Sequence, residues 1–169
     1  MKRLGNVAGA AVLALGGLAA CGGNNESGSG STAPAASQPA GGVAKLATAQ
    51  VGDLGKVVVD GSGRTLYVFD NDVQGKSNCD GDCASKWPPV AAGTGTPQLN
   101  GVDASLVGTT TRTDGTKQLT LGGLPLYLFA KDSKAGDAKG QAVGGVWWVV
   151  GPDGKKITTQ SSGNGNNGY

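Results

Sequence analysis

One aromatic motif, present twice, constrains the fold of this chain more than any other feature of its sequence. The pattern Leu-Tyr-x-Phe-x-x-Asp fills residues 66–72 and, sixty positions later, residues 126–132. Each copy follows an apolar run and a glycine turn, and each is followed by a glycine and then by tryptophan. The repetition predicts two similar structural units, because a pattern repeated at a fixed spacing folds into a repeated structure.

Both copies have the period of a β-strand. In the first copy Leu66 and Val68 alternate with Tyr67 and Phe69, so apolar side chains cover both faces of an extended segment. The glycines before each copy are typical of hairpin turns. Residues 83–87 favour a short helical turn, which the following prolines end.

These patterns predict a mainly all-β domain over residues 45–160. It should consist of antiparallel hairpins in two tandem similar halves, about 45–105 and 106–160. A half of this size has little core of its own, so we expect the two halves to share one core. The strands that carry Tyr67 and Tyr127 should then be related by an approximate two-fold axis.

The first twenty residues have the composition of an export signal. Lys2 and Arg3 precede an uncharged apolar run over residues 7–20, which is shorter than the roughly 18–20 residues needed to span a bilayer. The run ends in Leu-Ala-Ala before Cys21, which resembles the bacterial lipobox and implies cleavage there and lipidation of Cys21. The alternative is a plain secreted protein with a coincidental cysteine.

Two low-complexity segments flank the predicted domain. Residues 21–44 are rich in Gly, Ser, Pro and Ala, and residues 161–169 consist mostly of Gly, Asn and Ser. Such segments cannot bury enough apolar surface to fold. We therefore expect a flexible tether and a disordered tail, with the domain held on the extracytoplasmic face of a bacterial cell membrane.

The composition excludes several classes of function. The chain has no histidine, which rules out Ser-His-Asp and Cys-His catalysis and the usual zinc sites. Loss of Lys2 and Arg3 lowers the 14 basic residues by two, so that they equal the 12 acidic ones, and no basic cluster is present for nucleic acid. We therefore expect no enzyme, no cofactor and no nucleic-acid partner.

Two cysteines remain once Cys21 is assigned to lipid. Cys79 and Cys83 are four residues apart, and in an oxidising exterior they should form a structural disulfide. The alternative is a redox-active dithiol. It lacks the C-x-x-C spacing and a neighbouring histidine, and the flanking Asp80 and Asp82 should raise the thiol pKa rather than lower it.

Four carboxylates are weak candidates for a metal site. Residues 70–75 resemble the start of a calcium loop, with Asp70 and Asp72 as ligands and with Asp80 and Asp82 further along. The fifth and twelfth positions of the loop do not match, however. A polar turn that caps backbone amides explains the same residues, and we predict no metal.

The aromatic residues of the repeats are candidates for either a core or a binding surface. A small β domain needs large side chains in its core, whereas clustered aromatics also suit a ligand surface or an electron-hopping chain. Trp147 and Trp148 are consecutive and must point to opposite faces of a strand, so one of them is a candidate for exposure. The complete set of candidate binding residues is Tyr67, Phe69, Asp70, Asp72, Trp87, Tyr127, Phe129, Asp132, Trp147 and Trp148.

Taken together, these motifs resemble those of the bacterial secreted-repeat lipoproteins, which carry a Tyr-x-aromatic-x-x-Asp motif. The resemblance rests on the duplicated motif, on the Cys-Asp-Gly-Asp-Cys segment with Trp-Pro-Pro, and on Gly-Val-Trp-Trp-Val-Val-x-Pro-Asp-Gly near the end. It implies a location in the bacterial envelope and no particular mechanism. The cysteine pair and Trp-Pro-Pro occur in the first half alone, so we expect any localised function within residues 71–90.

Two main function classes remain open, and a hydrolase that uses paired carboxylates is the least favoured third. The first is a membrane-anchored binding or interaction module, whose partners are the membrane and another envelope protein. The second is a redox accessory protein, which would use Cys79 and Cys83 or the clustered aromatics beside a cofactor-bearing partner.

Overall fold

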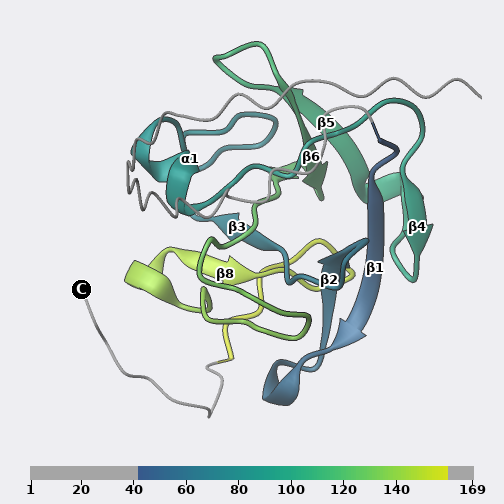
Figure 1. The fold of residues 1–169 in the computed structure, drawn as a ribbon, viewed down its shortest axis with the longest axis vertical. Coiled ribbons are helices and arrows are strands. Elements are labelled where there is room, and N and C mark those ends of the chain that lie inside the picture. The colour runs from purple at the N-terminus through teal and green to yellow at the C-terminus, as the bar shows by residue number, and fades with distance from the viewer. Residues whose placement is uncertain (1–41, 160–169) are drawn as a thin grey trace, which may run out of the picture. The chain divides into compact units, whose positions relative to one another are not determined.

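The computed structural model describes residues 42–159, and the elements of this part are mostly strands (Figure 1). The strands are β1 (Lys45–Gln50), β2 (Lys56–Asp60), β3 (Tyr67–Phe69), β4 (Gln98–Asn100), β5 (Val107–Thr111), β6 (Lys117–Leu121), β7 (Leu124–Pro125) and β8 (Trp147–Val149). The helical elements are α1 (Asp82–Lys86) and the single turns η1 (Gly52–Leu54), η2 (Ala104–Leu106) and η3 (Val143–Gly145). The mainly all-β prediction and the short helical turn are both confirmed.

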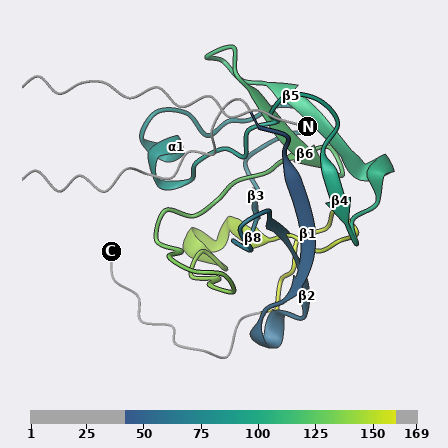
Figure 2. The same ribbon diagram turned by 45° about the vertical axis from the view of Figure 1, so that its right-hand side comes forward.

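The strands form three small sheets, with orders β2-β1-β4, β3-β8 and β5-β6-β7 (Figure 2). Within these sheets every pair of neighbouring strands is antiparallel except β1 and β4, which are parallel. The first and third sheets each contain one long hairpin, and the β3-β8 sheet joins a strand of the first half to a strand of the second half. Strands so short have little stability alone, so the domain depends on packing between the sheets.

The two long hairpins are equivalent. In β1-β2, Leu46 lies opposite Asp60, and in β5-β6, Val107 lies opposite Leu121. Their turns close with the same hydrogen bond, from Val51 N to Gly55 O in one and from Arg112 N to Thr116 O in the other. The duplicated sequence is therefore a duplicated structure.

The two halves meet at their tyrosines. Tyr67 and Tyr127 face each other in a single antiparallel β-bridge, in which each backbone N donates to the other's O at 2.9 Å. Tyr67 also pairs with Val149, and Tyr127 pairs with Pro89, sixty residues before Val149. These reciprocal pairings are those of the expected approximate two-fold axis, which passes between the two tyrosines.

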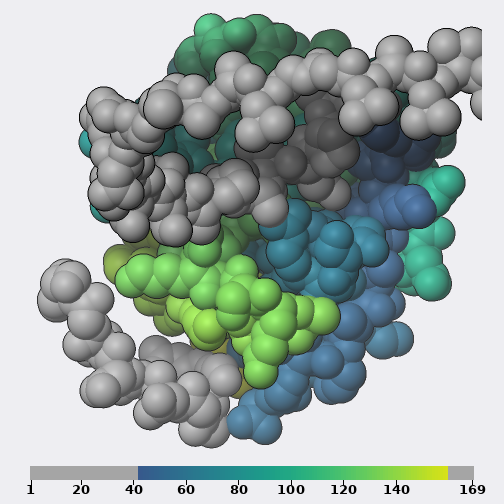
Figure 3. Space-filling view, viewed as in Figure 1, coloured from purple at the N-terminus to yellow at the C-terminus, as the bar shows by residue number. Residues whose placement is uncertain are grey.

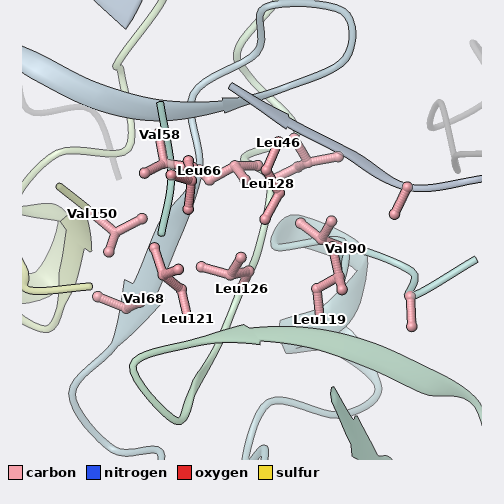
Figure 4. Packing of buried hydrophobic residues seen from close by; sticks show 13 residues of the cluster. Leu46, Val58, Leu66, Val68, Val90, Leu119, Leu121, Leu126, Leu128 and Val150 are labelled. Atoms are coloured by element: carbon pink, nitrogen blue, oxygen red, sulfur yellow. The ribbon is translucent and has the colours of Figure 1, made fainter. Parts of the chain in front are cut away.

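Two buried clusters make up the core, and each draws on both halves. One is aliphatic and contains Leu46, Val58, Leu66, Val68, Val90, Leu119, Leu121, Leu126, Leu128 and Val150 among others (Figure 4). The other is mainly aromatic and contains Tyr67, Tyr127, Trp87 and Trp147. Neither half could bury these side chains without the other, so the shared core is confirmed.

Residues just before the expected start at residue 45 also contact the domain. Val43 bridges Gly93, and Ala44 is buried in the aliphatic cluster. The export signal 1–20, Cys21, the rest of the tether up to residue 41 and the tail 161–169 lie outside the described residues. Within residues 42–159 no helix is both long and apolar enough to span a bilayer.

The segment after the second motif lies against the turn between β2 and β3. Gly136 N donates to Gly63 O at 3.4 Å, and the Cα of Gly63 has no side chain to keep Ala135 away. The green and blue surfaces that meet in Figure 3 correspond to these two segments. Contacts between the halves therefore extend to the domain surface.

Candidate functional site

Each repeat supplies the aspartate that binds the tyrosine of the other repeat. Tyr67 Oη donates to Asp132 Oδ2 at 2.6 Å, and Tyr127 Oη donates to Asp72 Oδ2 at 2.7 Å. The tyrosine and aspartate of one motif are thus not bonded to each other. The two copies of the motif therefore join the halves through reciprocal hydrogen bonds. Neither tyrosine has any solvent-exposed surface.

The two aspartates also hold the loops that follow them. Asp72 accepts a hydrogen bond from Asn78 N at 2.7 Å, and Asp132 accepts one from Lys139 N at 3.0 Å. In the second half the loop then covers Tyr67, because Gly140 N donates to its Oη at 3.2 Å. A Cβ at Gly140 would lie 2.8 Å from the Tyr67 ring, so only glycine fits there.

Burial dominates the protonation of this centre. It raises the pKa of Asp72 and Asp132, although the bonds from the tyrosines favour the charged carboxylate and oppose the rise. Burial, together with the neighbouring carboxylates, also raises the pKa of Tyr67 and Tyr127. Both phenols therefore stay protonated and serve as donors across the neutral range.

Four aromatic rings stack through the aromatic cluster. Trp87 and Trp147 are parallel, with centroids 3.8 Å apart and an interplanar angle of 4°. Phe129 stacks on Trp87 and Phe69 stacks on Trp147, each at 4.2 Å. The two tryptophans are equivalent residues of the two repeats, so the two-fold relation extends to this stack.

The tyrosines meet the stack edge-on. Tyr67 lies 5.3 Å from Trp87, and Tyr127 lies 5.1 Å from Trp147. Edge-to-face and offset-stacked pairs of this kind add about 0.5–1.5 kcal/mol each beyond area burial. The two tyrosines and the two tryptophans Trp87 and Trp147 are buried, so the interpretation of the aromatic residues as core holds for them. Phe69 and Phe129 are half-buried.

Trp148 and Asp70 lie apart from this centre, on the surface. Trp147 and Trp148 point to opposite faces of β8, as predicted, with Trp148 half-buried against the aliphatic cluster. Trp148 Nε1 donates to Asp70 Oδ2 at 2.8 Å. Lys156 Nζ lies 2.7 Å from Asp70 Oδ1 and 5.4 Å from the centroid of the Trp148 ring.

The four weak calcium candidates do not converge. Asp70 pairs with Lys156, Asp72 accepts a hydrogen bond from Tyr127, Asp80 pairs with Arg112, and Asp82 is the first residue of α1. Among residues 42–159 no three acidic or thiol side chains lie close enough to hold a metal ion. The Asp-rich segment is a set of caps and ion pairs.

Cys79 and Cys83 form the predicted disulfide, with 5.2 Å between their Cα atoms. Cys79 is fully buried in the aromatic cluster, and Cys83 is half-buried at the start of α1. The disulfide therefore joins the loop after the first motif to the core, in a place where the second half uses the close approach of Gly140.

Sequence reasoning missed Arg112, the buried cation that holds this loop. Its Nη1 donates to Ser77 Oγ at 2.9 Å and to Gln118 Oε1 at 2.8 Å. Its Nη2 donates to Cys79 O at 2.6 Å and to Asp80 Oδ1 at 2.8 Å. The signal was available in a comparison of the two hairpin turns, where Arg112 replaces an apolar valine.

Arg112 also has one unsatisfied donor. Its Nε is buried without a hydrogen-bond partner among the described residues, and Asp114 Oδ2 lies 4.0 Å away from it. Gln118 Nε2 continues the network to Leu126 O at 2.7 Å. The network is therefore a polar link that ties the first-half loop to the second-half hairpin.

A second missed residue, the carboxylate Asp137, organises the other loop. Asp137 Oδ2 accepts bonds from Ser133 N at 2.9 Å and Lys134 N at 3.3 Å, and it pairs with Lys139 Nζ at 3.0 Å. The hydrogen bond from Ser133 N contributes most, and together these interactions hold the pKa of the Asp137 carboxyl well below its usual range. Its backbone O accepts from Thr65 Oγ1 at 2.6 Å, which again links the two halves.

Two stretches of the chain, residues 48–91 and 108–151, match a family described as a secreted repeat of unknown function. They are sixty residues apart, as the duplicated motifs are, and each contains the hairpin strand, the tyrosine and the aspartate of one repeat. Comparison with curated proteins and with solved structures finds no match. Because the two stretches together cover slightly more than half of its length, the chain belongs to this family of secreted repeats.

Proposed function

We propose that this protein is a lipid-anchored binding module of the bacterial envelope, attached through Cys21 at the extracytoplasmic face, and not an enzyme. The export signal and lipobox-like ending support the anchor. The description of the family as secreted agrees with this location. The anchor leaves the domain free to meet another envelope protein while it stays at the membrane.

One observation carries the proposal for the domain: its distinctive polar side chains are used for internal contacts. The Tyr67–Asp132 and Tyr127–Asp72 pairs join the halves, and the Arg112 guanidinium donates to four acceptors within the fold. An active site needs such groups free to meet a substrate. Binding therefore belongs to the outer surface of a rigid scaffold.

The loop after the first motif is the surface that we favour. Val73 has 55 % of its surface exposed, the highest value among the exposed large hydrophobic residues of the described part. The loop is fixed beneath it, because Gly75 N donates to Gly123 O at 2.8 Å and Thr110 Oγ1 donates to Gly75 O. A rigid, exposed apolar side chain loses little entropy on binding, which favours association.

The anchor is tested by mass spectrometry of the native protein. We expect residues 1–20 to be absent and acyl mass to be present on Cys21, and Cys21→Ser should block this processing. A soluble Cys21→Ala protein with the same mature N-terminus as the wild type would show that export alone, without lipidation, explains the segment.

The binding surface is tested by photo-crosslinking on living cells. A photoreactive residue at position 73 should give one dominant protein adduct, whereas the same residue at position 143 should give none. Val143 is the matched control, because it is also an exposed valine, at 38 %, but lies in the other repeat. Equal adducts at both positions, or none at position 73, would contradict the assigned surface.

A further inference from the structure

Three oxidisable aromatic side chains of this domain each donate their N–H or O–H to an aspartate. The pairs are Tyr67 with Asp132 at 2.6 Å, Tyr127 with Asp72 at 2.7 Å, and Trp148 with Asp70 at 2.8 Å. A phenol or indole that loses an electron becomes a much stronger acid than the neutral side chain. An acceptor already within hydrogen-bond reach takes that proton without help from solvent.

The stacked tryptophans lie between the two tyrosine–aspartate pairs. Trp87 and Trp147 lie 3.8 Å apart and almost parallel, so the two rings can share the positive charge left by a lost electron. Tyr67 meets one of them at 5.3 Å and Tyr127 meets the other at 5.1 Å. Electron exchange among these four rings therefore needs no movement of the backbone.

Trp148 links these rings to the surface through the backbone of β8. Trp148 follows Trp147 directly in β8 and is half-exposed, whereas both tyrosines are fully buried. Phe69 and Phe129 cover the two ends of the tryptophan pair, and phenylalanine is much harder to oxidise. An oxidant in solution therefore meets Trp148 first.

We propose that this domain is a one-electron relay, in which Trp148 reduces an outer-sphere one-electron oxidant of the polypyridyl-ruthenium(III) class and the oxidising equivalent comes to rest on Tyr67 or Tyr127. In the first step the oxidant gains one electron. Trp148 loses that electron, and its indole proton moves to Asp70 Oδ2. The product is a neutral tryptophan radical beside a protonated aspartate.

Two further transfers complete the sequence. The Trp87–Trp147 pair gives an electron to the Trp148 radical, which takes its proton back from Asp70. A tyrosine then gives an electron to the pair, and its hydroxyl proton moves to Asp132 from Tyr67 or to Asp72 from Tyr127. The final state is one oxidant reduced by one electron, one neutral tyrosyl radical and one protonated aspartate, so electrons, protons and charge balance.

Burial supports the last step, since it raises the pKa of Asp72 and Asp132 and makes their protonated form easier to reach. The buried position of the tyrosines also protects a radical from solvent. Gly140 lies against Tyr67 with no room for a Cβ, which leaves no space for water on that side.

Flash photolysis tests the relay. The mature protein is oxidised with photogenerated tris(bipyridine)ruthenium(III), and every variant carries Tyr169→Phe because the third tyrosine lies outside the described residues. We expect a tyrosyl radical by transient absorption and by electron paramagnetic resonance. The Asp72→Asn/Asp132→Asn variant should form it about 100-fold more slowly, the effect of losing a positioned proton acceptor.

The controls separate the relay from a structural role. Asp103→Asn, at an exposed cap, should leave the rate unchanged, and Trp148→Phe should slow the first oxidation. Circular dichroism establishes that each variant is folded. Should the double variant fail to fold, the wild-type protein in deuterated solvent replaces it, and a slower tyrosyl step is then expected. An absent tyrosyl radical, or a rate insensitive to both the substitutions and deuterium, overturns the proposal.

Discussion

The crossed tyrosine–aspartate pairing leads to a quantitative prediction about Tyr127 and Asp72. The Tyr127→Phe substitution removes a hydrogen bond to a carboxylate at a position with no exposed surface. Hydrogen bonds to charged groups contribute about 1.5–3 kcal/mol, and the carboxylate would keep only its bond from Asn78 N within the described residues. We expect a loss of about 2 kcal/mol in the free energy of unfolding, which lowers Tm by about 8 °C for a domain of this size.

A double-mutant cycle shows which aspartate the phenol contacts. Tyr127→Phe with Asp72→Asn should give a coupling energy of about 1 kcal/mol, because Tyr127→Phe removes the bond and Asp72→Asn removes the charge that strengthens it. Tyr127→Phe with Asp132→Asn should couple by less than about 0.5 kcal/mol, although both residues belong to one motif. Asp132 is the matched control, since it lies in an equivalent environment but accepts from Tyr67.

Urea unfolding followed by tryptophan fluorescence measures all six proteins of the two cycles. The slope of the free energy against urea should stay constant, which establishes that the native and unfolded states remain comparable. A larger coupling with Asp132 than with Asp72 would refute the crossed arrangement. It would mean that each motif closes on itself and that the halves dock in another way.

Three further predictions concern pH, the disulfide and the buried arginine. Because the pKa values of Asp72 and Asp132 are raised, the native state holds more protons than the unfolded state above pH 3.8, and the free energy of unfolding should fall as pH rises through these pKa values. Urea titrations across that window should lose this slope when both residues are replaced by Asn. An unchanged slope would contradict the burial argument. Replacing Cys79 and Cys83 by Ser should lower stability by about 2 kcal/mol in thermal unfolding, and an unchanged Tm would show that the short loop is held by other contacts. Arg112→Met should lower the free energy of unfolding by about 2 kcal/mol, because the buried acceptors lose their donor whereas the Asp80 side chain, 46 % exposed, can return to water. Amide exchange in residues 77–80 should become faster. Unchanged protection of these amides would show that the guanidinium does not hold this loop.

Local pattern was enough to predict the elements of this fold. The alternation around Tyr67, the glycine turns before each motif and the four-residue spacing of Cys79 and Cys83 all act over a few residues. The structures of these features depend on local backbone geometry and on short loops, and both can be predicted from neighbouring residues in the sequence. The same holds for the duplication, since equal sequences form equal hairpins.

The partners across the two-fold axis could not be predicted in the same way. Tyr67 and Asp72 stand five residues apart in one motif, yet each bonds to the opposite repeat, because the antiparallel bridge between the tyrosines turns each phenol toward the other half. The burial of Arg112 has the same origin: a residue in a hairpin turn becomes a core residue only when the loop of the other half covers it. Spacing in the sequence fixes which residues share a strand, whereas the docking of two halves decides which side chains lose water, and burial of that kind gives these polar groups their energetic weight.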